Sequence, residues 1–595
     1  MIKILRASAG SGKTYNLAET YIRLLLSNDD PSAYRHILAV TFTNKATDEM
    51  KRRILKELHI LSVNPDKSPY KDDFIPSMFT SADALKRKSG DILIRILHDY
   101  GAFAVSTIDR FFQQTLKAFS REIGQFASYQ VELDKNSLVA ETVERILDGL
   151  TEDDKALLNW LSDNMMDQLE QGKRPNLVKN LTDKAQRLKS EQHRTVVEEN
   201  GIDEDKAYSK ESLDALRKRF RHFMAEFVQG LKEAAAEVNK AFSDNGLSTF
   251  DTKSKWLGNF LAKIDGLQPR ADIPVPSDSV RNKASDFSEW FKKDDQKAYA
   301  HLEGSLLPSF AKLIAYYDQG YKAYNTAKIL IGQIGDLGIA SELQKEFQNL
   351  LKEKNVLSLD DSNVILKNII DGSDAPFIYE KLGVRFEHFL LDEFQDTSRV
   401  QWDNFKPLIA NSDSEGFENL LVGDVKQSIY RFRDSDWKLM AVDVAREFPR
   451  ATEDSLKGNW RSLENLVEFN NEFFAYAAER LDKAYGNEDK GISVSMIYGK
   501  KDDGTFDKQI VKSKDDEKGF VEAIFCPKDD QKEHILKTIQ KIIEAGALPG
   551  DITVLVRKNT EGSDVAAFLM ENGYDVISDD SLRLKSSLIV RKLVS

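Results

Sequence analysis

The chain has 595 residues, of which 41% are hydrophobic and 30% are charged, and its formal net charge is −13. This composition excludes a collagen, a mucin-like stalk and a wholly disordered chain, and no apolar run is long enough to span a membrane. The single cysteine, Cys526, excludes an internal disulfide and a cysteine-built metal site, so we expect a cytoplasmic protein. The acidic balance lowers the expectation of nucleic-acid binding without removing it, because net charge does not report a local basic groove.

The first 135 residues alternate short apolar runs with helical stretches, which is typical of a parallel α/β sheet. Ile2–Leu5, Ile37–Phe42 and Phe103–Thr107 are the predicted strands of this part. From residue 136 to residue 380, apolar residues recur at helical spacing and strand-like alternation is scarce. We therefore predict an all-helical insertion over residues 136–380.

The α/β pattern returns after residue 380. His388–Leu391 and Asn419–Val422 are predicted strands, and residues 381–450 complete one α/β domain together with residues 1–135. Residues 451–595 form a second α/β segment. Its predicted strands are Gly519–Phe525, Ile552–Val556 and Tyr574–Ile577.

A phosphate loop stands between the strand Ile2–Leu5 and a predicted helix, Tyr15–Leu26. The loop comprises Ala7, Ser8, Ala9, Gly10, Ser11, Gly12, Lys13 and Thr14. Backbone N–H groups of such a loop bind polyphosphate, while Lys13 would reach the β- and γ-phosphates and Thr14 would hold Mg²⁺. The flanking strand and helix favour a nucleotide site over a glycine–serine turn with an exposed lysine.

Two adjacent carboxylates, Asp392 and Glu393, come directly after the strand His388–Leu391. Asp392 is expected to hold Mg²⁺, and Glu393 is expected to polarise the attacking water as a general base. The alternative is a pair of acidic residues that opens a helix, where the helix dipole favours negative charge. The phosphate loop elsewhere in the chain favours the hydrolytic interpretation.

Aromatic residues interleaved with cations occur in three further segments, Thr41–Ala46, Val422–Arg433 and Gly458–Ser462. Single-stranded nucleic acid is bound by such clusters, because bases stack on the rings while phosphates meet the cations. Stacking contributes about 1–3 kcal/mol per base. The alternative for each aromatic residue is ordinary core packing.

Together these segments resemble, in family order, the motifs of UvrD/Rep-type superfamily 1 DNA helicases. The matching runs are ASAGSGKT, TFTNKAT, STIDRFFQQTLK, LLDEFQDTS, VGDVKQSIYRFR and NWRS, and they look nearest to the AddA/RecB-like helicase–nuclease branch. The resemblance implies a P-loop NTPase fold, in which a RecA-like motor lobe carries the helical insertion and residues 451–595 begin a second, incomplete RecA-like lobe. It also implies ATP-dependent 3′-to-5′ movement on single-stranded and junction DNA in recombination or repair, with a partner that is a second helicase–nuclease subunit.

The resemblance also assigns roles to individual residues. Gln427 is expected to contact the γ-phosphate and Arg461 to act as an arginine finger, so both join Lys13 and Glu393 as catalytic residues. Tyr15 and Trp460 match positions that sandwich adenine in relatives. The expected DNA-binding residues are Phe42, Thr43, Asn44, Tyr430, Phe432 and Arg433.

The chain differs from the family pattern at both ends. It begins six residues before the phosphate loop, which leaves no room for the glutamine that reads adenine in relatives. It shows no counterpart of the later family motifs and no nuclease signature, so we expect the N-terminal part of a longer protein. Two alternatives stay open. One is a nucleotide- and DNA-binding fragment with little turnover, and the other is a P-loop ATPase that acts on a partner other than DNA.

Overall fold

The structure of the chain is a computed structural model. It describes residues 1–79, 81–119, 130–132, 135–152, 200–268, 271–370, 375–486, 494–499, 507–512 and 517–578, with a few separate positions between 154 and 197. The chain divides into two compact units, Met1–Arg461 with Ala477–Lys512, and Ser462–Tyr476 with Ser513–Ser595. Among the described residues, no helix is both long and apolar enough to cross a membrane.

The first unit is built on a six-stranded sheet in the order β3-β2-β6-β7-β1-β8. The strands are Val105–Thr107 (β3), Ile37–Thr41 (β2), His388–Leu391 (β6), Asn419–Gly423 (β7), Ile2–Ala7 (β1) and Thr452–Leu456 (β8). Every neighbouring pair is parallel. The predicted parallel α/β fold is therefore confirmed. Of the five strands expected in this part, His388–Leu391 has the predicted bounds, and the other four differ by one or two residues at one end.

Helices cover both faces of this sheet. One face carries α1 (Lys13–Ser27), α2 (Asn44–Val63), α3 (Lys71–Met78) and α4 (Ala82–His98), and the other carries α5 (Ile108–Ala118), α16 (Leu359–Ile370), α17 (Ala375–Leu382) and α18 (Arg399–Ser414). Successive strand residues alternate between the two cores: Leu38 and Val40 of β2 pack with α5 and α18, whereas Ala39 packs with α1 and α2. Because both faces are buried, each inner strand is a continuous apolar run, which is why the sequence shows it clearly.

The sixth strand, β8, lies beyond the boundary that we predicted at residue 450. It pairs in parallel with β1, with Lys3 opposite Thr452. Its sequence is TEDSL, and its side chains are largely exposed. A polar edge strand of this kind has no buried face, so hydrophobic alternation does not mark it.

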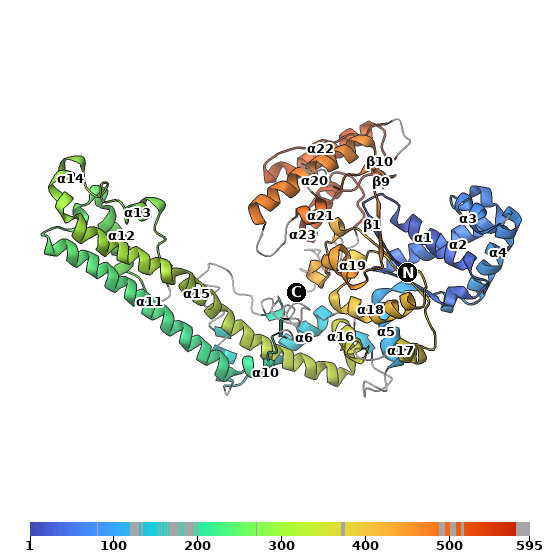
Figure 1. The fold of residues 1–595 in the computed structure, drawn as a ribbon, viewed down its shortest axis with the longest axis horizontal. Helices are drawn as coiled ribbons and strands as arrows, with labels where there is room; N and C mark the ends of the chain where they lie inside the picture. The colour runs from blue at the N-terminus through green and yellow to red at the C-terminus, as the bar shows by residue number, and fades with distance from the viewer. Residues whose placement is uncertain are drawn as a thin grey trace. The chain divides into compact units, whose positions relative to one another are not determined.

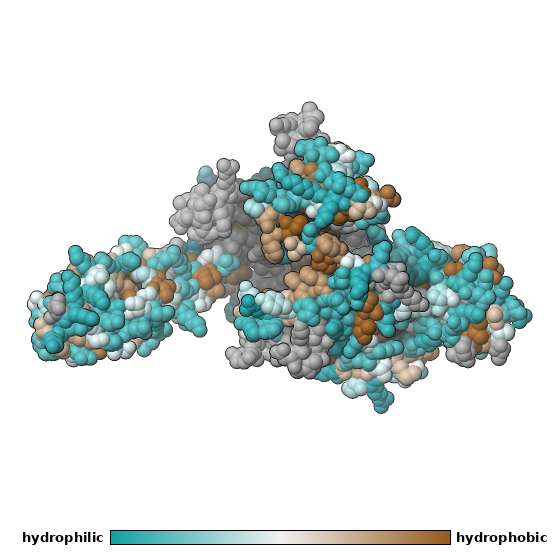
Figure 2. Space-filling model, turned by 90° about the horizontal axis from the view of Figure 1, so that it is seen from above, coloured by the Kyte–Doolittle hydropathy of each residue, from teal (hydrophilic) through white to brown (hydrophobic). Residues whose placement is uncertain are grey.

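Two long helices, α11 (Lys210–Asp244) and α15 (Glu303–Lys354), dominate the predicted insertion and lie side by side (Figure 1). They are antiparallel, because Phe227 stacks on Tyr316 with ring centroids 5.5 Å apart, whereas Glu237 pairs with Lys312 at 2.6 Å. The shorter helices at one end of the pair are α12 (Trp256–Asp265), α13 (Asp278–Asn282) and α14 (Lys293–Tyr299). We call α11 to α15 the helical arm. Figure 2 shows mainly hydrophilic side chains along its visible face.

The prediction that residues 136–380 are entirely helical is wrong at one point. Val356–Ser358 (β5) pairs in parallel with Gln130–Glu132 (β4). A strand of three residues is too short to show an alternating pattern, so the sequence does not reveal it. In addition, α16 and α17 pack on the sheet before residue 380 is reached.

In the second unit, α22 (Gln531–Glu544) packs against α23 (Asn559–Glu571). The three strands predicted here, over residues 519–525, 552–556 and 574–577, are wrong, because none forms a ladder with any described residue. Their apolar side chains are exposed, with Phe525 at 97%, Leu555 at 91% and Ile577 at 97%. Alternation signals a face that can be buried, but a strand also needs a neighbour for its N–H and C=O groups.

Phe405→Ala should lower the free energy of unfolding by about 3–5 kcal/mol, because it leaves a cavity in a closed core. Phe405 is fully buried, and its ring centroid lies 5.5 Å from that of Phe111 and 4.7 Å from that of Phe112. Urea unfolding followed by circular dichroism measures the change. The control is Leu97→Ala at an exposed position of α4, which should cost about 0.5 kcal/mol or less. Equal losses for the two variants would contradict this assignment of the core.

Candidate active site

The predicted site residues gather at one edge of the six-stranded sheet. Parallel strands place their carboxyl ends together, and ligands of open α/β sheets bind outside those ends. The phosphate loop leaves β1, Phe42 follows β2, Asp392 follows β6 and Asp424 follows β7. Motifs that are hundreds of residues apart in the sequence are therefore neighbours in the structure.

The phosphate loop is shaped by two glycines in the left-handed region, Gly10 with φ +73° and Gly12 with φ +93°. Gly12 is the N-cap of α1 and has no side chain to cover the helix end. In the part of the chain that the structure describes, the N–H groups of Gly12, Lys13 and Thr14 donate to no protein acceptor. Unpaired N–H groups at a helix N-terminus bind anions, so the loop fits a polyphosphate.

Lys13 and Glu393 form an ion pair with Nζ and Oε2 2.7 Å apart. Glu393 itself has φ +49°, a left-handed conformation that is uncommon outside glycine. Such backbone strain clusters at functional sites, where the surrounding structure holds it. The structure thus joins the predicted phosphate-binding lysine to the predicted general base.

Three carboxyl groups, those of Asp392, Glu393 and Asp396, lie near the cation of Lys13. Burial, assisted by the charge of Glu393, raises the pKa of Asp392 to about 6 and that of Asp396 to about 7. The Oδ1 atom of Asp396 is buried and has no hydrogen-bond partner among the described residues. A cation placed between these groups would stabilise their ionised forms.

The donor set fits Mg²⁺ rather than a transition metal. Asp392 and Thr14 supply the hard oxygen atoms that Mg²⁺ prefers. No group of three or more His, Cys, Asp or Glu side chains among the described residues could hold a metal ion by itself. Mg²⁺ in nucleotide sites is commonly held by one or two protein ligands together with phosphate oxygens and water.

Gln395 was missed by the sequence analysis, which assigned roles only to the two acids before it. Its Nε2 donates to Glu393 Oε2 at 2.8 Å, and its Oε1 accepts from the backbone N–H of Asp424 at 2.8 Å. It therefore connects the end of β6 to the end of β7. The sequence offered one signal for this role, since Gln395 follows Asp392 and Glu393 in the same polar segment after β6. Asp424 also accepts a hydrogen bond from Gln427, whose Nε2 lies 2.7 Å from Asp424 Oδ2.

Four of the six predicted DNA-binding residues form a cluster. The ring of Phe42 lies 4.9 Å from that of Tyr430, which lies 5.9 Å from the ring of Phe432. The guanidinium of Arg433 lies 5.5 Å from the Tyr430 ring and 5.8 Å from the Phe432 ring. Phe432 is 78% exposed, which argues against a core role for its ring. An exposed ring beside a cation suits the stacking of a nucleic-acid base.

The other two predicted DNA-binding residues start a helix. Thr43 is the N-cap of α2, and its hydroxyl accepts from the backbone N–H of Ala46 at 3.1 Å. Asn44 is the first residue of that helix and is exposed. The Thr43 hydroxyl thus has a structural partner, and its role toward DNA stays a prediction.

The two predicted adenine residues both follow the phosphate loop in the sequence, Tyr15 directly and Trp460 far along the chain. Trp460 is 62% exposed, and its backbone N–H donates to the carbonyl of Gly10 at 2.9 Å. Tyr15 packs on Tyr70, with ring centroids 4.6 Å apart, and forms one wall of a cavity of about 380 Å³. Arg461 is exposed and follows Trp460 directly, and its Cβ lies close to Gly10 of the phosphate loop.

A family model for the UvrD/REP helicase N-terminal domain matches residues 2–447. An ATP-dependent helicase/nuclease subunit of Lactiplantibacillus plantarum is 23% identical over 525 residues, which cover 84% of this chain and 40% of that protein. RecBCD enzyme subunit RecB of Chlamydia trachomatis is 24% identical over 79% of this chain and 42% of its own length. RecB of Escherichia coli is also 24% identical, over 80% of this chain and 38% of its own length. The chain thus spans about two fifths of the length of these curated relatives.

Gly10→Ala should lower the free energy of unfolding by about 1–3 kcal/mol, because a side chain is strained at a left-handed position. The new Cβ would also lie 2.7 Å from Asn459 Oδ1 and 3.0 Å from Arg461 Cβ. Chemical unfolding followed by circular dichroism measures the loss. Gly101→Ala is the matched control, since nothing lies within 4 Å of its added Cβ. An unchanged stability of Gly10→Ala would contradict the close packing of the loop against residues 459–461.

Proposed function

The chain belongs to the UvrD/REP helicase N-terminal domain family, and on this basis we propose that it is the motor part of an ATP-dependent DNA helicase or translocase. The observation that carries the proposal is the meeting of Lys13 and Glu393, which are 380 residues apart, beside the aromatic segments that follow β2 and β7. A nucleotide site and a strand-binding cluster at one sheet edge are what such a motor requires.

In the proposed reaction, Lys13 binds the β- and γ-phosphates and the loop N–H groups orient the polyphosphate. Thr14 and Asp392 would hold Mg²⁺, which would neutralise phosphate charge. Glu393 accepts a proton from the attacking water. Gln395 supports this role because its amide already donates to a Glu393 carboxylate oxygen.

The remaining residues of the nucleotide site are proposed to contact the phosphate charge and the adenine base. Gln427 is proposed to contact the γ-phosphate, and Arg461 to stabilise the charge that develops in the transition state. In phosphoryl-transfer enzymes such an arginine contributes about 10³–10⁵-fold in rate. Tyr15 and Trp460 are proposed to stack on adenine, for which the exposed Trp460 ring is suited.

The strand-binding side rests on Phe42, Tyr430, Phe432 and Arg433. A continuous set of hydrogen bonds leads toward it from the hydrolytic residues: Gln395 contacts both Glu393 and Asp424, and Gln427 contacts Asp424. We infer that this network conveys the nucleotide state to the segment that carries Tyr430. The proposed outcome is 3′-to-5′ movement along single-stranded DNA.

The activity of a whole protein is proposed from its relatives. Their names describe a subunit of a helicase/nuclease and a subunit of the RecBCD enzyme, which supports work on DNA in recombination or repair together with a second subunit. By itself, the 595-residue chain is proposed to bind nucleotide and single-stranded DNA and to hydrolyse ATP slowly.

Glu393→Gln should leave MgATP affinity nearly unchanged and lower the ATP hydrolysis rate by about 10²–10⁴-fold, because the general base is lost. Lys13→Ala should instead abolish MgATP binding, since the phosphate contact is lost. Calorimetric titration and a phosphate-release assay, each with and without an oligo-dT strand, measure the two effects. Oligo-dT should stimulate hydrolysis by the unsubstituted chain. A lack of stimulation, with ATP binding intact, would favour a P-loop ATPase that acts on another partner.

Phe432→Ala should weaken binding of oligo-dT by about 1–3 kcal/mol and spare MgATP binding, because one stacking surface is removed. Arg433→Ala should weaken binding and lower the salt slope by about 1, since one phosphate contact is lost. Fluorescence anisotropy over a salt series measures both. Tyr485→Ala, at a side chain that is 81% exposed, is the control. If Phe432→Ala also abolished MgATP binding, its ring would have a structural role instead.

A further inference from the structure

A short segment, Asp507–Lys512, contacts three motifs of the candidate active site without belonging to any of them. We call it the strap. Its strand β10 (Ile510–Val511) pairs in parallel with β9 (Gly458–Asn459). Two further backbone hydrogen bonds hold it, from Ile510 N to Lys457 O and from Lys512 N to Asn459 O, both at 2.8 Å. The strap is therefore fixed beside the residues that lead into Trp460 and Arg461.

Gln509 reaches from the strap to the phosphate loop. Its Nε2 donates to the carbonyl of Ala9 at 3.0 Å, and its Oε1 accepts from Asn459 Nδ2 at 2.9 Å. Both ends of the amide are used, so only one orientation of the Gln509 side chain satisfies both partners. The carbonyl of Ala9 is consequently bound in a defined direction.

This contact has a consequence for the N–H groups of the loop. A peptide unit is planar, and its C=O and N–H point in opposite directions, so fixing Ala9 C=O fixes the direction of Gly10 N–H. The next carbonyl, that of Gly10, is bound by Trp460 N at 2.9 Å. Two successive peptide units of the phosphate loop are therefore oriented by contacts from outside the loop.

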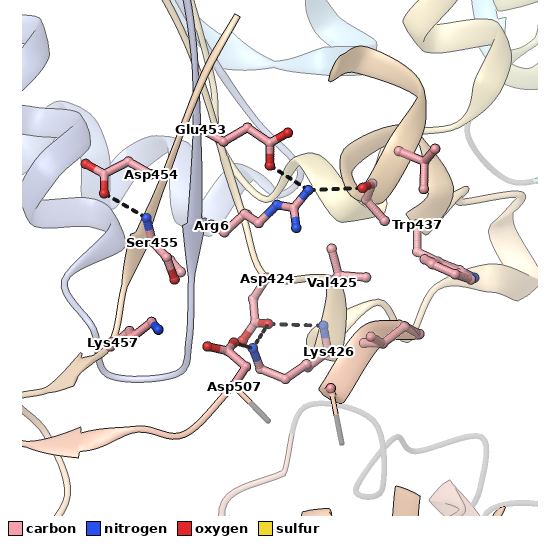
Figure 3. Close-up of a pocket in the computed structure, with 16 residues that line it drawn as sticks. Arg6, Asp424, Val425, Lys426, Trp437, Glu453, Asp454, Ser455, Lys457 and Asp507 are labelled. Atoms are coloured by element: carbon pink, nitrogen blue, oxygen red, sulfur yellow. Dashed lines mark hydrogen bonds and ion pairs between the residues drawn. The ribbon is translucent and has the colours of Figure 1, made fainter. Parts of the chain in front are cut away.

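The strap is anchored at its other end to the segment after β7. Asp507 and Asp424 both pair with Lys426, with Oδ2 of Asp507 2.5 Å and Oδ1 of Asp424 3.4 Å from Nζ. Figure 3 shows this arrangement in the wall of a cavity of about 720 Å³. Trp437 and Lys457 also line this cavity. The Lys426 side chain is only 18% exposed, so its two carboxylate partners are well placed to hold it.

We propose that Gln509 is a positioning residue for the polyphosphate of the bound nucleotide. It acts through Ala9, by holding the loop so that Gly10 N–H faces the phosphates before they bind. Asp507 supports this role by anchoring the strap to Lys426, and Asn459 supports it by donating to the Gln509 side-chain amide. This inference rests on the proposed nucleotide site and extends it to Gln509 and Asp507, which lie outside the recognised motifs.

The test compares the 595-residue chain with Gln509→Ala and Gln509→Glu. Calorimetric titration measures the affinities for MgATP and for magnesium tripolyphosphate, which carries no base. Gln509→Ala should weaken both ligands by about 3- to 10-fold, since one orienting hydrogen bond is lost. Gln509→Glu should weaken them further, because it places a carboxylate against the Ala9 carbonyl. Lys508→Ala, its exposed neighbour in the strap, is the control and should bind both ligands normally.

Hydrogen exchange gives a readout that does not depend on a ligand. The loop peptide over residues 7–15 should exchange faster in Gln509→Ala, whereas peptides of α18 should not change. If both Gln509 variants bind the two ligands as tightly as the parent chain, the inference is overturned while the nucleotide site stands. Weaker MgATP binding with unchanged tripolyphosphate binding would also overturn it, because the role would then concern the base. A parent chain that binds neither ligand would overturn the proposed function as well.

Discussion

The parallel alignment of β2, β6, β7 and β1 is the constraint on which the site depends. It places four strand ends along one edge, so that Lys13 after β1 meets Glu393 after β6 across 380 residues of chain. The helical arm is accommodated because it leaves the sheet after β3 and returns before β6. The entropy cost of a long connection grows only slowly with its length, so the insertion need not disturb the edge.

The same edge concentrates negative charge in a region of low exposure. The pKa values of Asp392 and Asp396 are both raised, first by burial and then by Glu393, and Lys13 is the nearby cation that lowers them. Buried carboxylates with so little compensation are costly in a structure that serves only stability. Their presence beside a loop of unpaired N–H groups is expected where a polyphosphate and a divalent cation bind together.

Two connections leave this centre, and both use side-chain amides. Gln395 links the hydrolytic carboxylates to Asp424 and so to the segment that carries Tyr430 and the exposed ring of Phe432. Gln509 links the phosphate loop to the strap, whose other end pairs with Lys426 of that same segment. An amide donates and accepts at once, which suits it to joining a carbonyl or carboxylate on one side to an N–H on the other.

The sequence by itself determined the inner strands of the first sheet and the residues of the phosphate loop and carboxylate pair. Strands buried on both faces are continuous apolar runs, and a phosphate loop needs glycine and lysine at set positions. Only the tertiary structure decided that β8 joins this sheet and that the extended segments of the second unit form no ladder among the described residues. It alone brought Gln509 to Ala9, 500 residues away. Periodicity records which face of an element is buried, whereas a single polar contact between distant residues leaves no periodic trace.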